Sequence, residues 1–229
     1  MKKPLPSILP TTLWDFPSQH YGDRMQGDQA YVGATPSYIV WNLLSRYTKP
    51  GATVVDPFCG SGTTLDVAKD LGRDGVGFDL APSRPDIRQA DARKIPLPDR
   101  SADFVFMDPP YGDHIRYSDH PDCIGKLSSL ETGFFQAMDK AFSEGTRLLR
   151  PGAHLAVYVC DFFNVRKGFS PVGFRLFSLL EKRLEAVEIV SVVRHNKDLL
   201  KGNYRKAAVE QNFYLRGFNY LLIMKRPRL

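Results

Sequence analysis

Apolar residues recur along this chain at two spacings, and the alternation between them predicts a sheet flanked by helices. Short apolar runs, which indicate buried strands, occur at residues 53–55, 75–78, 87–90, 102–107, 155–159, 187–193 and 214–224. Apolar residues three and four positions apart, the spacing of one helix face, occur at residues 65–71, 130–149 and 172–183. Strands that alternate with helices form a mainly parallel sheet covered on both faces, so we predict an α/β fold.

The chain before the first strand divides into an arm and a helix. Residues 1–34 are rich in Pro, Gly, Asp and Gln and predict an arm that packs on the body through Trp14 and Phe16. Thr35 suits a helix N-cap and Pro36 the first helical position, so we predict a helix that starts there. We therefore expect an arm, residues 1–34, and a single domain, residues 35–229.

The composition is that of an ordinary globular domain. With 43% hydrophobic and 24% charged residues, the chain falls outside the disordered, collagen-like and coiled-coil classes. Neither a secretory signal nor an apolar run of about 18–20 residues is present, so we expect no membrane span. Three distant cysteines without a CxxC pair favour a reducing cytoplasm over a disulfide framework. His114, His120 and Cys123 match no metal-ligand spacing, so we predict no metal.

Three of the predicted strands end at an acidic residue. Asp56, Asp79 and Asp108 each close an apolar run. The carboxyl ends of parallel strands meet at one edge of a sheet, and ligands bind there. We therefore expect the three carboxylates along one edge, where they mark a site.

A glycine-rich loop joins the first of these strands to a helix. In residues 56–62, DPFCGSG, the glycines permit a positive φ and let a ligand approach the backbone. A helix N-terminus and Asp79 beyond it suit a nucleoside, since a carboxylate at that strand end can bind ribose hydroxyls. The loop is neither a GxGxxG nor a Walker sequence, so a tight structural turn is the alternative.

The most informative stretch is Asp108-Pro109-Pro110-Tyr111, directly after a strand. Two prolines fix φ and remove N–H donors, so the turn holds carbonyl oxygens outward beside a carboxylate and an aromatic ring. Such a pocket suits a planar ring with an exocyclic amine: the oxygens accept both N–H groups while Tyr111 stacks. Fixed acceptors of this kind direct the nitrogen lone pair at an electrophile.

Together these motifs resemble the S-adenosylmethionine-dependent amino-methyltransferases of nucleic-acid bases. FCGSG at residues 58–62 is similar to the family's FxGxG motif, and DPPY at 108–111 to its catalytic motif. The resemblance implies a Rossmann-like fold, with a mostly parallel seven-stranded sheet and an antiparallel last strand. It implies catalytic roles for Asp108, Pro109, Pro110 and Tyr111. It implies cofactor contacts for Thr35, Ser37, Asp56, Phe58, Gly60, Gly62, Asp79 and Asp91.

The resemblance also implies an acceptor, either N6 of adenine or N4 of cytosine, and we expect the base to be in DNA. The aspartate at the first position of the DPPY motif favours adenine over cytosine. In this chain the glycine loop precedes the DPPY motif, and in family members with this order a sequence-reading domain usually follows the catalytic core. This chain ends soon after the catalytic core. Recognition could instead fall to an insertion at residues 112–129, to a predicted loop at residues 194–211 or to a partner subunit. The alternatives are an RNA base methyltransferase, a protein-glutamine methyltransferase, and a non-catalytic nucleic-acid-binding subunit.

Charge supports a polyanionic partner. The net charge is +6, and residues 182–229 carry 11 Lys and Arg against 4 Asp and Glu. A solvated basic surface is the alternative. The predicted nucleic-acid contacts are Arg194, Lys197, Lys201, Arg205 and Lys206. A homodimer is compatible with the sequence, and neither the target sequence nor a cognate endonuclease follows from it.

Overall fold

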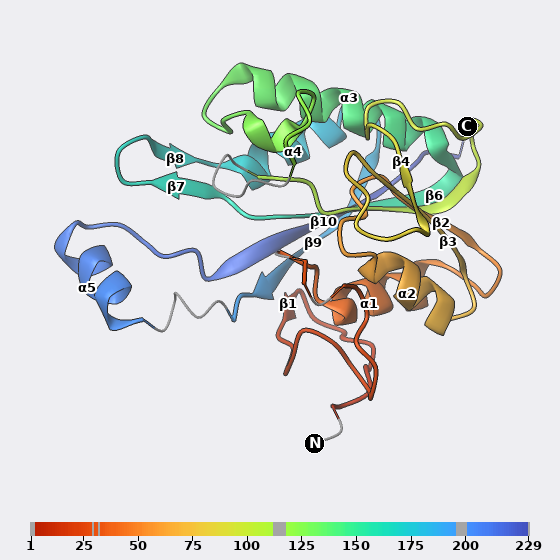
Figure 1. Cartoon of the computed structure of the whole chain (residues 1–229), viewed down its shortest axis with the longest axis horizontal. Helices are drawn as coiled ribbons and strands as arrows, with labels where there is room; N and C mark the ends of the chain where they lie inside the picture. Colours follow the sequence, from red (N-terminus) through yellow and green to blue (C-terminus); the bar gives the residue numbers. More distant parts are fainter. Residues whose placement is uncertain (1–2, 29, 32, 112–117, 196–200, 229) are drawn as a thin grey trace.

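A single sheet organises the chain in the computed structural model, which describes residues 3–28, 30–31, 33–111, 118–195 and 201–228. The eight strands lie in the order β1-β9-β10-β6-β5-β2-β3-β4 (Figure 1). Their bounds are β1 Leu13–Trp14, β2 Thr53–Asp56, β3 Asp74–Asp79, β4 Ile87–Gln89, β5 Ala102–Met107, β6 Leu149–Val159, β9 Glu185–Val193 and β10 Phe218–Lys225. All neighbouring pairs are parallel except those of β10, which runs antiparallel to β6 and β9.

Helices cover both faces of this sheet. Figure 1 shows α1 (Ser37–Tyr47) and α2 (Thr63–Asp70) on one face and α3 (Thr132–Leu148) and α4 (Val172–Leu180) on the other. Three smaller elements lie outside these layers: η1 (Ile124–Lys126), the hairpin β7 (Phe162–Asn164) with β8 (Gly168–Ser170), and α5 (Gly202–Glu210). None of the described helices combines the length and the apolar character that a membrane crossing needs.

Successive side chains of each strand enter two separate cores. In β5, Phe104 and Phe106 pack on the α1 and α2 side, whereas Val105 and Met107 pack on the α3 and α4 side. All four are fully buried, and burying such a side chain stabilises the fold by about 1.5–3 kcal/mol. A strand segment buried on both faces must be continuously apolar, and residues 104–107 show this pattern in the sequence.

The predicted Rossmann-like fold, with its antiparallel last strand, is confirmed. The sheet has one strand more than the seven expected, because two residues of the arm form β1 beside β9. There the Ser191 N–H donates to the Thr12 carbonyl oxygen at 2.8 Å. Trp14 and Phe16 of the arm are buried in the α1 and α2 core.

Local details differ from the predictions. Thr35 does not cap α1: the N-cap is Pro36, and the Thr35 hydroxyl donates to Asp108 instead. β6 begins at Leu149, well before the predicted residue 155, because Leu149 pairs with Ala102 of β5. The stretch 194–211, read as a loop, contains α5.

Candidate active site

The three acid-ended strands meet at the centre of the sheet. The chain runs from β2 outward to β3 and β4, and then returns to β5 on the other side of β2. Connections that leave two neighbouring strands in opposite directions open a crevice at their carboxyl ends. Asp56 and Asp79 end β2 and β3, and Asp108 follows β5, so all three lie at this crevice.

Carboxylates hold the glycine loop after β2 in shape. Gly60 and Gly62 have φ angles of 46° and 80°, a region that favours glycine. Asp79 Oδ2 accepts the Gly60 N–H at 3.0 Å. The buried Asp56 accepts the Phe58 N–H at 2.9 Å and the Thr64 hydroxyl at 2.6 Å, and its burial raises its pKa to about 7. The loop is therefore fixed by side chains from two strand ends.

A cavity of about 760 Å³ opens beside this loop. Nine of the sequence-predicted site residues line it: Thr35, Phe58, Gly60, Asp79, Asp91, Asp108, Pro110, Tyr111 and Arg194. The glycine loop and the Asp108 turn, which are far apart in sequence, thus face one space. This common cavity is the geometry that a transfer between two bound molecules needs.

Other predicted residues lie behind the cavity wall. Asp56 accepts a hydrogen bond from the backbone of the glycine loop, and Pro109 is buried in the turn that follows Asp108. Ser37 is fully buried at the start of α1, where its N–H donates to the Gln19 carbonyl oxygen at 2.9 Å. A Cβ on Gly62 would lie 2.6 Å from Nη1 of Arg84, so this glycine admits a guanidinium.

The Asp108 carboxylate accepts a hydrogen bond from a neighbouring hydroxyl. Thr35 Oγ1 donates to Asp108 Oδ2 at 2.5 Å. Burial, and then the charge of Asp56, raise the pKa of Asp108 to about 7. Burial and the Asp108 charge raise the pKa of Tyr111 to about 12, so its hydroxyl is a neutral donor. An aspartate in this setting offers one oxygen to Thr35 and keeps the other for a ligand.

Two arginines lie at or next to the cavity wall. Burial tends to raise the pKa of the lining residue Asp91, but Arg93, which binds it at 2.9 Å, lowers this pKa below its usual value. Near Asp108, Arg194 lines the wall, and its Nη1 donates to Cys160 Sγ at 2.9 Å. The cavity thus has a guanidinium close to the turn predicted to hold the acceptor.

Tyr31, Tyr158 and Asn219 are among the lining residues that sequence reasoning missed. Tyr31 of the arm lies over the glycine loop: a Cβ on Gly60 would be 2.9 Å from its ring. Tyr158 of β6 and Asn219 of β10 also line the cavity. Asn219 is 5% exposed, and its Oδ1 has no hydrogen-bond partner among the described atoms. A lone asparagine in the apolar run 218–224 was the available signal, whereas nothing in the sequence marked Tyr31.

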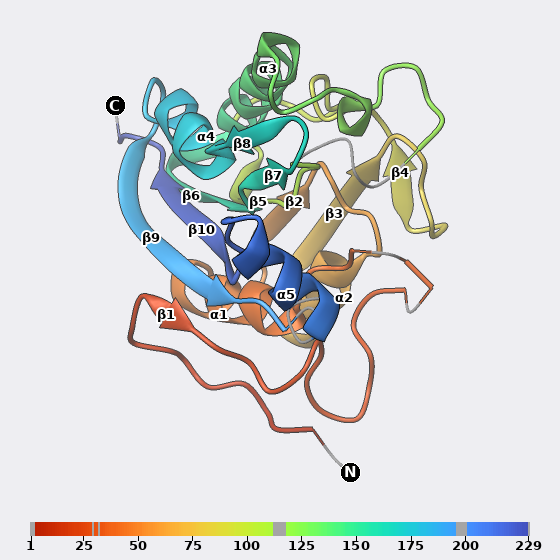
Figure 2. The same cartoon turned by 90° about the vertical axis from the view of Figure 1, so that its left-hand side faces the viewer.

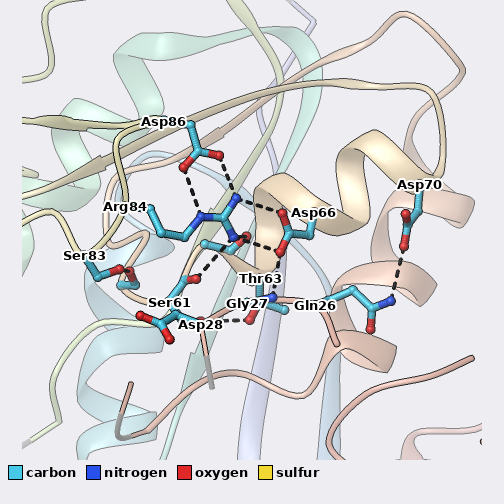
Figure 3. Close-up of polar contacts among 12 residues, drawn as sticks. Gln26, Gly27, Asp28, Ser61, Thr63, Asp66, Asp70, Ser83, Arg84 and Asp86 are labelled. Atoms are coloured by element: carbon cyan, nitrogen blue, oxygen red, sulfur yellow. Dashed lines mark hydrogen bonds and ion pairs between the residues drawn. The ribbon is translucent and has the colours of Figure 1, made fainter. Parts of the chain in front are cut away.

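An arginine joins the arm to the glycine loop (Figure 3). Arg84 donates to both oxygens of Asp66 at 2.8 and 2.9 Å and also to both oxygens of Asp86. The same Asp66 accepts the Gly27 N–H at 2.7 Å, and the Asp28 N–H donates to the Ser61 carbonyl oxygen. The arm is therefore fastened to α2 through the Asp66 carboxylate, which Arg84 neutralises, and to the glycine loop through a backbone hydrogen bond.

Replacing Arg84 by alanine should loosen this junction. We expect the free energy of unfolding to fall by about 1–2 kcal/mol, a modest loss because the Arg84 side chain is 23% exposed to solvent. We also expect a protease to cleave the arm faster, because Arg84 holds the Asp66 carboxylate that accepts the hydrogen bond from the Gly27 N–H. Urea denaturation and limited proteolysis measure the two effects, and Arg88→Ala, an exposed neighbour, is the control. If Arg84→Ala and Arg88→Ala had the same free energy of unfolding and the same rate of cleavage, the role of Arg84 in fastening the arm would be contradicted.

The remaining predicted residues lie away from the cavity or outside the described residues. Lys201, Arg205 and Lys206 lie exposed at or in α5, and Lys197 and His114 are outside the described residues. In the described part of the chain, no three His, Cys, Asp or Glu side chains form a metal-binding group. Cys59 packs beneath Gly77, where a Cβ would be 2.3 Å from its sulfur.

Comparison with known sequences gives a family match for the first part of the chain. Residues 6–89 match the sequence model of the N6/N4 methyltransferase family, described as DNA methylase. The chain is 32% identical over 71 residues to the type II methyltransferase M1.MboII of Moraxella bovis, and 33% over 70 residues to M.HinfI of Haemophilus influenzae. These alignments cover 30% and 31% of this chain, but only 27% and 20% of the two relatives.

Comparison with solved structures extends to most of the chain. TrmN of Thermus thermophilus superposes with a TM-score of 0.55 at 20% identity, over 85% of this chain and 50% of that one. The 1,6-didemethyltoxoflavin-N1-methyltransferase of Burkholderia thailandensis superposes with a TM-score of 0.53 at 14% identity, over 83% and 78%. At such identities the likeness concerns the fold. The chain thus has the Rossmann-like fold of S-adenosylmethionine-dependent methyltransferases, and its residues 6–89 match the DNA methylase family.

Proposed function

We propose that this protein transfers a methyl group from S-adenosylmethionine to an exocyclic amine of a base in DNA, with N6 of adenine as the preferred acceptor. The observation that carries the proposal is the common cavity, in which Asp108 and Tyr111 face the same space as Gly60 and Asp79. The family match of residues 6–89 supports the class of enzyme and of substrate.

The glycine-loop end of the cavity fits the cofactor. The ring of Tyr31 packs directly against the Gly60 backbone, where a Cβ would lie 2.9 Å from it, so a glycine is needed at this point of the cavity wall. Asp79 lines the cavity at the end of β3, where its carboxylate is placed to accept hydrogen bonds from ribose hydroxyls. When bound, S-adenosylmethionine supplies an electrophilic methyl group on a sulfonium. We assign Gly60, Phe58 and Asp79 to holding it.

The Asp108 end fits an amine acceptor. Thr35 occupies Asp108 Oδ2, which leaves Oδ1 to accept one N–H of the amine. A carbonyl oxygen of the proline turn would accept the second N–H, and Tyr111 would stack on the base. These contacts align the nitrogen lone pair with the methyl group and supply acceleration through positioning. A base within a duplex reaches this cavity only after it flips out of the stack.

Incorporation of tritiated methyl groups from the cofactor tests the proposal. The protein is incubated with genomic DNA, with total RNA, and with a protein mixture, and label is counted in each polymer. We expect label in DNA. Label in RNA alone or in protein alone would contradict the proposed substrate and would support one of the alternative acceptors.

Activity should depend on pH through Asp108. Because its pKa is raised to about 7, Asp108 carries a proton below that pH and becomes an acceptor-only carboxylate above it. We therefore expect kcat/KM to increase as the pH rises from 5.5 to about 7 and to level off above. In Asp108→Asn the residual activity should lose this acidic limb, since an amide does not titrate there. An unchanged limb in that variant would assign the ionisation to another group and contradict this account.

A further inference from the structure

Two segments project from the sheet beside the cavity. The β7–β8 hairpin follows the carboxyl end of β6, and α5 lies in the connection between β9 and β10. In Figure 1 both extend past the edge of the sheet on the same side, and Figure 2 shows them both on the side facing the viewer. We call residues 162–170 and 201–217 together the projecting unit.

Ring contacts tie the two segments together. Phe163 of the hairpin stacks on Phe213, which follows α5, with ring centroids 5.1 Å apart and planes at 23°. The Arg216 guanidinium lies 5.9 Å from the Phe163 ring and 5.3 Å from the Phe169 ring. The hairpin and the α5 connection therefore present one surface.

The projecting unit is strongly basic. One acidic residue, Glu210, stands against six cations: Arg166, Lys167, Lys201, Arg205, Lys206 and Arg216. Five of these cations are exposed, and Arg216 is half-buried against the rings. Among the described residues, no carboxylate lies within ion-pair distance of Arg166 or Arg205, so their charges are available to a polyanion.

Helix α5 is largely exposed in the described part of the chain. None of its nine residues is buried. A helix this short is marginal in water without packing. Exposed apolar side chains stand beside the cations, with Tyr204 at 44%, Tyr214 at 81% and Phe169 at 51% exposure. Cations interleaved with exposed aromatic rings are typical of nucleic-acid-binding surfaces.

The strand ends connect this surface to the acceptor end of the cavity. Arg194, which lines the cavity, begins the connection to α5. It contacts Cys160, the residue after β6 and shortly before the hairpin. β6 is also the neighbour of β5, which leads to Asp108. A duplex held on the projecting unit therefore lies next to the pocket that a flipped base would enter.

We propose that the β7–β8 hairpin and α5 bind the sugar–phosphate backbone of double-stranded DNA on both sides of the target base. This inference rests on the proposed function for the identity of the polyanion. Backbone contacts of this kind orient the duplex and add affinity without reading sequence. They release bound counterions, so their number appears in the salt dependence of binding.

Charge reversal at the hairpin tip tests the surface. The double variant Arg166→Glu/Lys167→Glu changes two exposed side chains in a turn, so the core stays intact. Its binding to a fluorescent 30-base-pair duplex of mixed sequence is measured by anisotropy at several salt concentrations. We expect at least about a tenfold higher Kd and a salt slope smaller by about 2, since each lost phosphate contact contributes about 0.9. The affinity for S-adenosylhomocysteine should stay unchanged.

Two further variants keep the test decisive. Arg205→Glu/Lys206→Glu on α5 should weaken duplex binding in the same way. Lys49→Glu/Lys69→Glu makes the same charge change at two exposed positions outside the projecting unit, one between α1 and β2 and one in the last turn of α2, and should bind as the wild type does. Wild-type affinity in both projecting-unit variants, or tighter binding to RNA of the same sequence, would overturn the proposal.

The outcome also separates this proposal from the proposed activity. If DNA is methylated but the charge reversals bind normally, the surface is wrong and the activity stands. If the reversals lose duplex binding while no nucleic acid is methylated by the wild type, the surface stands and the activity is wrong.

Discussion

Substituting Asp108 by alanine should reduce kcat/KM for methyl transfer by about 10²–10⁴ while the Kd for S-adenosylhomocysteine stays within about threefold. The reason is positional. Asp108 is bound to Thr35 in the part of the cavity proposed to take the acceptor, whereas the glycine loop is held by Asp56 and Asp79. Removing its carboxylate deletes an amine acceptor and leaves the loop intact. Steady-state kinetics and calorimetric titration measure the two quantities.

Matched variants make the Asp108→Ala result specific. Asp74→Ala removes an exposed carboxylate at the opposite end of the sheet, where β3 begins, and should keep full activity. Asp108→Asn retains one acceptor oxygen and should fall between alanine and the wild type. If Asp108→Ala methylates at the normal rate, or if it loses cofactor affinity as severely as activity, the assignment of Asp108 to the acceptor is wrong.

Substituting Asp79 by alanine should produce the reverse pattern. Asp79 lines the cavity and accepts the N–H groups of Gly60 and Ala81, both at 3.0 Å. Its loss removes the expected ribose acceptor and one restraint on the glycine loop. We expect the cofactor Kd to rise about 10- to 100-fold, and kcat at saturating cofactor to change less than about threefold.

The control for Asp79→Ala is Asp86→Ala, a nearby carboxylate that is exposed and outside the cavity. It should leave the cofactor Kd close to the wild-type value, because Asp66 still binds Arg84. A normal cofactor Kd in Asp79→Ala would contradict the placement of the cofactor at β3. Opposite kinetic signatures for Asp79 and Asp108 would show that the cavity has two functional ends.

The fold, the glycine loop and the Asp108 turn could be predicted from the sequence, because each follows from the pattern of neighbouring residues. A strand segment buried on both faces has to be apolar, as residues 104–107 of β5 are, and its end is marked in the sequence by Asp108 and two prolines. Parallel strands then bring their carboxyl ends together, which unites Asp56, Asp79 and Asp108 without any knowledge of contacts.

Contacts between residues far apart in the chain could not be predicted from the sequence alone. Thr35 has the residue type of an N-cap, but a hydrogen bond to Asp108, 73 positions away, takes its hydroxyl. Tyr31 reaches the glycine loop because Gly27 and Asp28 fasten the arm to α2 and Ser61, which no local pattern encodes. Helix α5 carries no apolar stripe to bury, so its periodicity was too weak to distinguish it from a loop.

The most direct test of the central claim is the chemical identity of the methylated product. Genomic DNA treated with the protein and trideuteromethyl-labelled S-adenosylmethionine is digested to nucleosides and analysed by mass spectrometry. We predict a labelled methyl group on the exocyclic amine of a deoxynucleoside, chiefly N6 of deoxyadenosine, and its loss with Asp108→Ala. Label at a ring carbon such as C5 of cytosine, or no labelled deoxynucleoside at all, would contradict a pocket built to present an amine.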